Sequence, residues 1–281
     1  MPAETGWAAV DAARSALLPR IQRLHSCDDE TKLVKVDFRR RNPEPDHIEI
    51  SHLTDLQYGH KLFQLPRFLR YRDWILSSDA RFTVLGGDLI DAATVLSIAS
   101  PYENTGEPID QVYGLIELLR PLSEAGRILG YVGGNHERRT VKSFGDVGRL
   151  IARELKIPYS RGVQLIDIWY GEHKPFKISI WHGSGSARTK GAKAQMLHRF
   201  MGQGDSRVYA VGHLHDAMVL FDWRHKRERG KIRLEKVAGI MSSSFLGYWN
   251  SYAETAAMSP SDTMMGRIIL EPNGHWEVTM R

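Results

Sequence analysis

A strand that ends in two glycines and an acid constrains the fold of this chain more than any other stretch of its sequence. The apolar run 82–85 is followed by Gly86, Gly87 and Asp88, and a second acid, Asp91, comes three residues later. A short apolar run of this kind is typical of a buried strand, and open α/β folds keep their ligand sites at the carboxyl ends of such strands. Two carboxylates at that edge of a sheet indicate a cation site.

Four further stretches have the same design, with an apolar strand followed by residues that can bind a metal. After the strands at 48–54, 128–132, 176–181 and 208–211 come Asp55 and Gln57, then Asn135, then His182, and finally His213 and His215. Oxygen donors mixed with imidazole suit Mn, Fe or Zn, and the absence of cysteine from these stretches disfavours a thiolate zinc site. Two histidines at i and i+2 on a strand end share a face, and a carboxylate between two cations can bridge them.

The pattern between these stretches predicts an α/β protein. We expect strands at 47–53, 82–87 and 127–133 and helices at 61–77, 109–125 and 144–155, followed by strands at 163–169, 176–181, 207–211, 217–223, 231–238, 266–271 and 275–280 and a helix at 189–202. The first half of the chain therefore favours parallel strands and the second half a mixed arrangement. Together they predict two packed sheets flanked by helices.

The beginning of the chain is expected to be an extension of the main domain. Apolar residues at helical spacing over 7–24 predict an amphipathic helix, and the alternation over 32–38 predicts a strand that ends in a basic turn. We treat residues 1–46 as an N-terminal extension packed on a domain that spans 47–281. A solvated turn is the favoured interpretation of the arginines at 39–41, with a phosphate contact as the alternative.

Composition sets the broad class of the protein. With 281 residues, of which 42% are hydrophobic and 25% charged, the chain can bury a sizeable core. The formal charge of +5 tolerates an anionic partner such as nucleic acid without requiring one. The single cysteine, Cys27, excludes an internal disulfide. Because no apolar run reaches the ~18–20 residues of a membrane helix and no secretory signal is seen, we expect a cytoplasmic protein without a membrane partner.

In their order along the chain, these stretches resemble the calcineurin-like metallophosphoesterase superfamily, whose blocks run D-x-H, G-D-x-x-D, G-N-H-E/D, H and G-H-x-H. Four blocks match, namely those at 87–91, 134–137, 182 and 212–215, and the match spans about residues 47–216. The first block departs from the family, because Gln57 stands where the family usually has His. The resemblance implies a four-layer α/β/β/α sandwich of two mixed sheets.

The resemblance also implies a dinuclear metal centre. One metal would be held by Asp55, Gln57, Asp88 and His215, and the other by Asp88, Asn135, His182 and His213, with Asp88 as the bridge. A neutral amide oxygen such as that of Gln57 binds a hard cation more weakly than imidazole binds zinc or iron. A similar D-x-Q block is known in the Mn-dependent ADP-ribose/CDP-alcohol diphosphatases. We therefore expect two divalent ions, with Mn favoured over Fe, Zn, Ni or Mg.

The chemistry implied by the resemblance is the hydrolysis of a phosphoester. His136 would face the scissile phosphate and donate to the leaving oxygen or to the charge of the transition state, with Asp91 orienting its imidazole. A metal-bridging hydroxide would attack phosphorus in line, because the cations lower its pKa. Protein phosphatases of the superfamily carry Arg-Gly after the second acid of the G-D-x-x-D block. Ala92 and Ala93 stand there instead, which disfavours that branch.

The basic charge, an aromatic stretch at 242–252 and a basic hairpin at 224–231 favour a phosphodiester in a nucleotide or nucleic acid as the substrate. The hairpin is either a solvated turn or a nucleic-acid contact, and the aromatic stretch is either core or a platform for a stacked base. The arginines beside His136 are either a phosphate clamp or a solvated helix start. The candidate substrate contacts are Arg138, Arg139, Phe245, Tyr248 and Trp249.

Three other functions stay open on the sequence. The first two are a nucleotide-diphosphate hydrolase of the ADP-ribose/CDP-alcohol type and a phosphomonoesterase. The third, from a different class, is a non-catalytic scaffold that keeps the fold. The remaining histidines lack strand-end context and are interpreted as surface or core residues: His52, His60, His173, His198, His225 and His275. The sequence does not indicate the oligomeric state.

Overall fold

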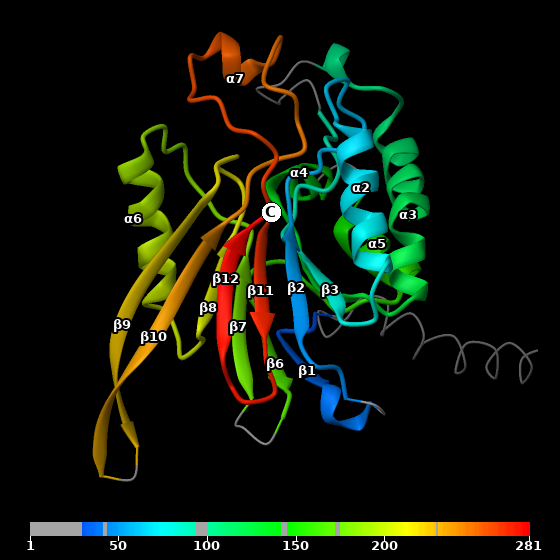
Figure 1. Cartoon of the computed structure of the whole chain (residues 1–281). Coiled ribbons are helices and arrows are strands. Elements are labelled where there is room, and N and C mark those ends of the chain that lie inside the picture. Colours follow the sequence, from blue (N-terminus) through cyan, green and yellow to red (C-terminus); the bar gives the residue numbers. More distant parts are fainter. Residues whose placement is uncertain (1–29, 42–43, 94–100, 142–144, 172–174, 229) are drawn as a thin grey trace, which may run out of the picture.

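Two six-stranded sheets packed face to face form the centre of the computed structural model (Figure 1). The structure describes residues 30–41, 44–93, 101–141, 145–171, 175–228 and 230–281. Helices α2, α3 and α5 lie against one sheet, and α6 lies against the other. The expected four-layer α/β/β/α sandwich is therefore confirmed. No helix of the described ranges is long and apolar enough to cross a membrane.

The first sheet, called sheet A, is mixed. Its strands run in the order β1 (Leu33–Asp37), β6 (Gln164–Trp169), β7 (Phe176–Trp181), β8 (Val208–Val211), β10 (Lys231–Met241) and β9 (Met218–Glu228). β7, β8 and β10 are parallel to one another, whereas β6 is antiparallel to β7 and β9 is antiparallel to β10. β1 is parallel to β6 at the edge, so part of the expected N-terminal extension is a strand of this sheet.

The second sheet, sheet B, has a parallel centre and an antiparallel edge. Its strands run in the order β12 (Trp276–Met280), β11 (Gly266–Leu270), β2 (Ile48–Leu53), β3 (Arg81–Leu85), β4 (Ile128–Val132) and β5 (Tyr159–Ser160). β2 to β5 are parallel, and β11 is antiparallel to both of its neighbours. The last two strands of the chain thus join the sheet built by its first half.

The helices begin where local hydrogen bonds favour them. They are α2 (Leu65–Leu76), α3 (Pro108–Glu124), α4 (Asn135–Thr140), α5 (Val147–Leu155), α6 (Lys190–Met201) and α7 (Tyr252–Thr255). Asp146 caps α5 by accepting the amide of Arg149 at 3.0 Å, and Thr189 caps α6 by accepting that of Ala192 at 3.3 Å. Such caps satisfy amides that the helix itself leaves without partners.

The hydrophobic core has one layer between the sheets and one under the helices on each side. Ile50 and Val84 point between the sheets, where they meet Ile178 and Ala210 of sheet A. Alternate residues of the same strands, such as Leu53, face α2, α3 and α5 instead. The strands of sheet B are therefore buried on both faces, which explains their continuous apolar sequences.

The expected elements are present with shifted ends. The helix expected over 144–155 begins at Val147, and a separate short helix, α4, lies upstream of it. The strands expected at 217–223 and 231–238 continue to Glu228 and Met241. β5 and α7 are too short to leave a periodic pattern in the sequence. The helix expected over 7–24 lies outside the described residues, and the division of the chain at residue 46 stays a prediction.

Candidate metal centre

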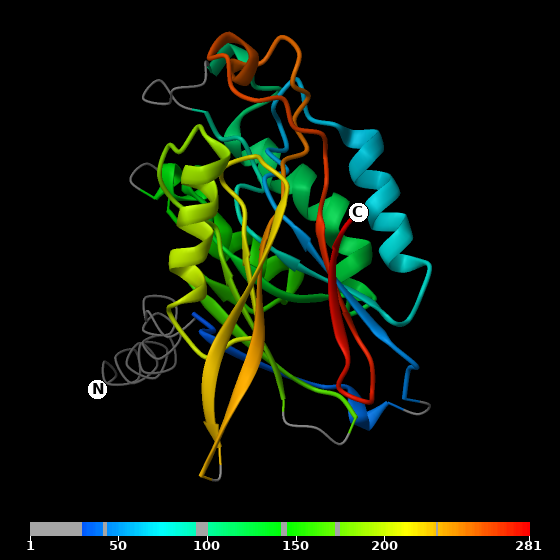
Figure 2. The same cartoon turned by 60° about the vertical axis from the view of Figure 1, so that its left-hand side comes forward.

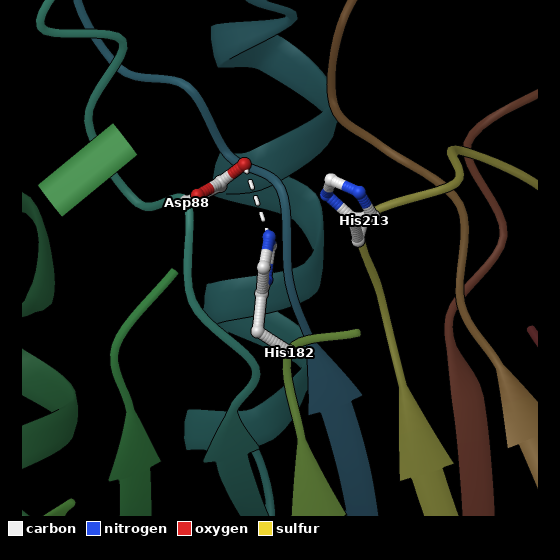
Figure 3. A group of neighbouring side chains, drawn as sticks. All are labelled: Asp88, His182 and His213. Carbon is white, nitrogen blue, oxygen red and sulfur yellow. Dashed lines mark ion pairs between the residues drawn. The ribbon is translucent and has the colours of Figure 1, made fainter. Parts of the chain in front are cut away.

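The carboxyl ends of β2, β3, β4, β7 and β8 meet at one end of the sandwich and bring the predicted donor residues together. Figure 3 shows Asp88 after β3, His182 after β7 and His213 after β8 turned toward one another. Ligand atoms of these three residues all lie within 4.8 Å of one another, which makes them a group that can hold a metal ion. Stretches almost a hundred residues apart in sequence thus form one buried cluster.

His182 is oriented by a backbone carbonyl. Its Nδ1 donates to the carbonyl oxygen of Gly86 at 2.8 Å, which turns Nε2 toward Asp88 Oδ2 at 3.1 Å and Asn135 Oδ1 at 3.0 Å. Burial disfavours the charged ring, but Asp88 outweighs burial and raises the pKa of His182 to about 9. The proton on Nε2 of His182 therefore lies between this ring, the Asp88 carboxylate and the Asn135 amide oxygen, at the position where a cation would bind.

A second group of donors forms around His215. Its Nε2 lies 3.1 Å from Asp55 Oδ1 and 3.2 Å from the side-chain nitrogen of Gln57. The other carboxylate oxygen of Asp55 accepts the Thr54 hydroxyl at 2.6 Å and the amide of His213 at 2.9 Å. Asp55 Oδ1 is buried, and among the described residues its polar neighbour is His215 Nε2 alone. A carboxylate oxygen left in this state fits a cation ligand.

The backbone at the donor residues is unusual. Asp55, Gln57, Asp88, His213 and His215 have φ angles of 51°, 49°, 49°, 68° and 48°. Residues other than glycine rarely adopt this left-handed region, and each such residue costs ~1–3 kcal/mol. Interactions in the rest of the fold must offset this free-energy cost. Five of the seven predicted ligands therefore share a conformation that is concentrated at functional sites.

Two glycines are required by close approach at these strand ends. A Cβ on Gly134 would lie 2.0 Å from Asp88 Oδ1 and 2.2 Å from its backbone nitrogen. A Cβ on Gly212 would lie 2.3 Å from Asp55 Oδ2. The glycines of the G-N-H-E and G-H-L-H blocks thus make room for the carboxylates that end the neighbouring strands.

His136 lies between the two acids of the β3 block. Its backbone nitrogen donates to Asp88 Oδ1 at 2.8 Å, and its Nδ1 lies 2.6 Å from the carbonyl oxygen of Asp91 and 3.3 Å from Asp91 Oδ1. The ring Nε2 faces Asp88 Oδ2 at 3.6 Å. Burial opposes the charged ring, but Asp88 and Asp91 together raise the pKa of His136 above its usual value.

Glu137 and Lys193, to which the sequence analysis assigns no role, hold the loops that carry the donor residues, called the donor loops. The buried carboxylate of Glu137 accepts the amides of Asp88 at 3.1 Å, Leu89 at 2.7 Å and Gly134 at 2.9 Å. On the other side, Lys193 of α6 donates to the Leu214 carbonyl at 3.1 Å. Glu137 could be suspected from its place in the G-N-H-E block, whereas nothing near Lys193 in sequence signals its role.

A cavity of about 340 Å³ opens above the cluster and is lined by Asp88, Asn135, His136 and His213. Arg139 also lines it, and the Nη1 atom of Arg139 is buried without a hydrogen-bond partner among the described residues. Arg138 is exposed and lies outside the cavity lining. The structure therefore brings only one of the two predicted arginines to the cavity.

The aromatic stretch divides between core and cavity. Tyr248 lines the cavity. Trp249 is 71% exposed, and its ring packs edge-on against the ring of Tyr248 with the ring centres 5.4 Å apart. Phe245 is fully buried and packs against Phe68 and Tyr71. The prediction of Phe245 as a substrate contact is wrong, because its ring fills the core beneath α2.

Of the histidines set aside in the sequence analysis, His173 lies outside the described residues, and the others are surface or core residues with one exception. His60 lines the cavity, and its Nδ1 accepts the Leu62 amide at 3.0 Å. His52 is buried beneath the donor loops and contacts the Ser242 hydroxyl at 2.9 Å. Burial lowers the pKa of His52 to about 4, so its ring is neutral in the folded protein at neutral pH.

The donor set fits a divalent cation. It combines carboxylate, amide and imidazole groups, and its carboxylates and His182 are buried while His213 is half-buried. Hard and borderline cations such as Mn, Fe and Zn prefer these ligands. The Asp88, His182 and His213 group can therefore hold a metal.

Comparison with known proteins gives structural similarities only. No protein-family model matches the chain, and no curated protein does. The fold is similar to that of Pseudomonas putida nuclease MPE, with 12% identity over 82% of this chain and 87% of that one and a TM-score of 0.34. It is also similar to GAP50, the anchor in the inner membrane complex of Plasmodium, with 13% identity over 84% of each chain and a TM-score of 0.44.

These similarities add nothing about activity at such identities and TM-scores. The two-sheet architecture is the one that the resemblance of the sequence implied.

Proposed function

We propose that this protein is a metal-dependent phosphoesterase that hydrolyses phosphodiester bonds. The observation that carries the proposal is the position of His136, whose ring is fixed by Asp91 beside the carboxylate of Asp88. Two divalent ions, Mn in the first instance, would share Asp88. The remaining ligands would be Asp55, Gln57 and His215 for one ion and Asn135, His182 and His213 for the other.

The chain's own residues divide the work of the reaction. Bound cations would supply Lewis acidity and lower the pKa of a water molecule. Asp91 holds Nδ1 of His136, which leaves Nε2 to donate a proton to the leaving oxygen. Arg139 offers a guanidinium to a non-bridging phosphate oxygen, since its buried Nη1 has no other partner among the described residues. Glu137 and Lys193 keep the donor loops in place.

The substrate we propose is a diester of a nucleotide or nucleic acid. Tyr248 in the cavity and Trp249 at its rim offer aromatic faces to a base, and Arg139 offers a contact to phosphate. A second candidate is a nucleotide-diphosphate hydrolase. It is supported by the size of the cavity, about 340 Å³, which suits a small ligand, and by the amide donor Gln57.

The test is hydrolysis of bis-p-nitrophenyl phosphate, p-nitrophenyl phosphate and ADP-ribose by Mn-loaded protein. His136→Ala should abolish turnover of the diester, whereas His198→Ala, on the exposed face of α6, should leave it unchanged. Preference for the monoester would favour a phosphatase, and activity on ADP-ribose alone would favour the second candidate. Full occupancy by metal without turnover of any of the three would favour a scaffold and contradict the proposal.

A further inference from the structure

The hairpin of β9 and β10 forms an arm that extends past the other strands of sheet A (Figures 1 and 2). Each of its strands has 11 residues, and the hairpin projects away from the sandwich at the end opposite α4 and α7. We call residues 221–236 the arm. In an antiparallel pair, residues opposite each other point to the same face, so the pairing defines two faces of the arm.

One face of the arm, its inner face, continues the surface that packs between the sheets. Phe221 pairs with Ala238, which lies in the core between the sheets, and every second pair toward the tip is on the same face. These pairs are Trp223 with Lys236, His225 with Leu234, and Arg227 with Ile232. β12 of sheet B reaches the base of this face, where Lys236 lies over the ring of Trp276. Farther along the arm the apolar side chains of the same face are more than half exposed to solvent.

The inner face combines exposed apolar groups with basic ones. Phe221, Trp223, Ile232 and Leu234 are 53%, 60%, 67% and 65% exposed. In each of the three outer pairs, one large apolar side chain stands opposite one basic side chain, and the four pairs include no acid. Exposed apolar side chains gathered on one face are typical of an interaction site.

The opposite face of the arm has a different character. Its buried Glu235 accepts Arg224 at 2.7 Å and Lys226 at 2.5 Å, and Asp222 contacts His198 of α6 at 3.0 Å. Most of the charge on this face is therefore neutralised within the protein. The four pairs of the inner face contain no acid that could neutralise its cations, and Lys236 lies over the rings of Phe221 and Trp276.

We infer that the inner face of the arm binds single-stranded nucleic acid. Its cations fit phosphates, and the rings of Trp223 and Phe221 offer faces on which bases stack. Residues of one face repeat every ~6.8 Å along a strand, so successive pairs offer a basic and an apolar group to successive nucleotides. A second copy of this chain packed on the same face would place cation against cation, which disfavours it.

The choice of nucleic acid as the ligand of the arm rests on the proposed function, in which the substrate is a diester of a nucleotide or nucleic acid. β9 begins at Met218, three residues after the candidate ligand His215. A strand bound along the arm would therefore lead toward the metal centre. The arm would act as a binding surface separate from the cavity, so its role can be measured without hydrolysis.

The experiment measures binding of a fluorescein-labelled 20-nucleotide oligo(dT) by fluorescence anisotropy, using the full chain with Mn and His136→Ala to prevent cleavage. We expect Trp223→Ala to weaken binding about tenfold. We expect Arg227→Gln to lower the slope of log K against log salt by ~0.7, the value for one phosphate contact on a single strand. Arg233→Gln, which removes the same charge from the opposite face, should change the slope by less than half as much.

Equal effects of Arg227→Gln and Arg233→Gln, or unchanged binding in Trp223→Ala, would overturn the inference. A dimer that Trp223→Ala converts to a monomer in sedimentation would also overturn it, in favour of a second copy. Loss of binding to vesicles that contain phosphatidylserine, with oligo(dT) binding unchanged, would overturn it in favour of a membrane surface. Trp223→Ala in the otherwise unchanged chain should hydrolyse bis-p-nitrophenyl phosphate normally, so failure of the arm is distinguishable from failure of the proposed function.

Discussion

The two ends of the sandwich differ in how tightly their residues are constrained. At the strand ends that carry Asp55, Asp88 and His213, the backbone is left-handed, the carboxylates are buried and the neighbouring glycines leave no room for a methyl group. At the other end, the arm has extended backbone and exposed side chains. Asp55, Asp88 and His182 at the first end are held by hydrogen bonds to other groups of the same protein, whereas the inner face of the arm has few such neighbours.

The sequences of the two ends therefore have different physical causes. Glycine and strained backbone at the metal centre follow from distances within the fold. The alternation of apolar and basic residues along the arm does not follow from packing, because these side chains are largely exposed. Substitutions at the two ends should therefore affect different measurements.

The largest effect is expected at the shared carboxylate. Asp88→Asn removes the charge that faces His182 and His136, so we expect loss of bound metal and a fall in diesterase activity of at least about 10²–10³-fold. Metal content and kcat would be measured together. Asp222→Asn on the arm is the matched control and should change neither. Normal metal content in Asp88→Asn would contradict the proposed bridge.

The next effect concerns the glycine beside that carboxylate. Gly134→Ala places a Cβ within 2.2 Å of Asp88, so we expect the free energy of unfolding to fall by about 1–3 kcal/mol. Gly162→Ala, where no atom lies within 4 Å of the added Cβ, should change it by less than ~0.5 kcal/mol. Chemical denaturation of both variants checks this. Equal stability of the two variants would mean that the loops at the strand ends can shift to accommodate the added Cβ.

A pH effect of similar size is expected from His52. The folded protein holds the pKa of His52 at about 4, below the usual 6.5, so the unfolded chain binds a proton there first as pH falls. Stability from this group is therefore present above pH ~6.5 and is lost toward pH 4, by at most about 3 kcal/mol. His52→Gln should reduce the slope of stability against pH in that window, whereas Ser242→Ala, which keeps the ring, should not.

The smallest effect is expected on the arm. Leu234→Ser replaces an exposed side chain, so the free energy of unfolding should change by less than ~0.5 kcal/mol. Phe245→Ala in the core should cost about 3–5 kcal/mol by the same measurement. A large loss of stability in Leu234→Ser would show that the inner face of the arm is covered, and the contrast between the two ends would fail.

The sequence predicts the metal centre better than its surroundings. A buried strand followed by glycine and a donor is a local pattern, and parallel strands bring such donors to one edge, so the cluster of Asp88, His182 and His213 could be expected. Burial of Phe245 depends on where α2 lies, and the contact of Lys193 with the Leu214 carbonyl depends on α6. No local pattern carries that information.

Strand order shows the same limit. Apolar runs and alternation predicted the long strands, but not that β1 would join sheet A or that β11 and β12 would join sheet B. Partner choice is decided by the packing of the whole chain, to which one strand contributes little. The length of β9 was underestimated for a related reason, since the charged residues 224–228 that end it lack the apolar alternation of a half-buried strand.

The exchange of strands between the sheets also affects how the protein can be made. β2 is synthesised early, yet one of its two neighbours, β11, is encoded more than two hundred residues later. On the ribosome, one edge of β2 therefore stays open until residues 266–270 have left the exit tunnel. Pairings of such long sequence separation form slowly and leave apolar edges open meanwhile. The nascent chain should therefore bind chaperones through β2 until synthesis has passed residue 270.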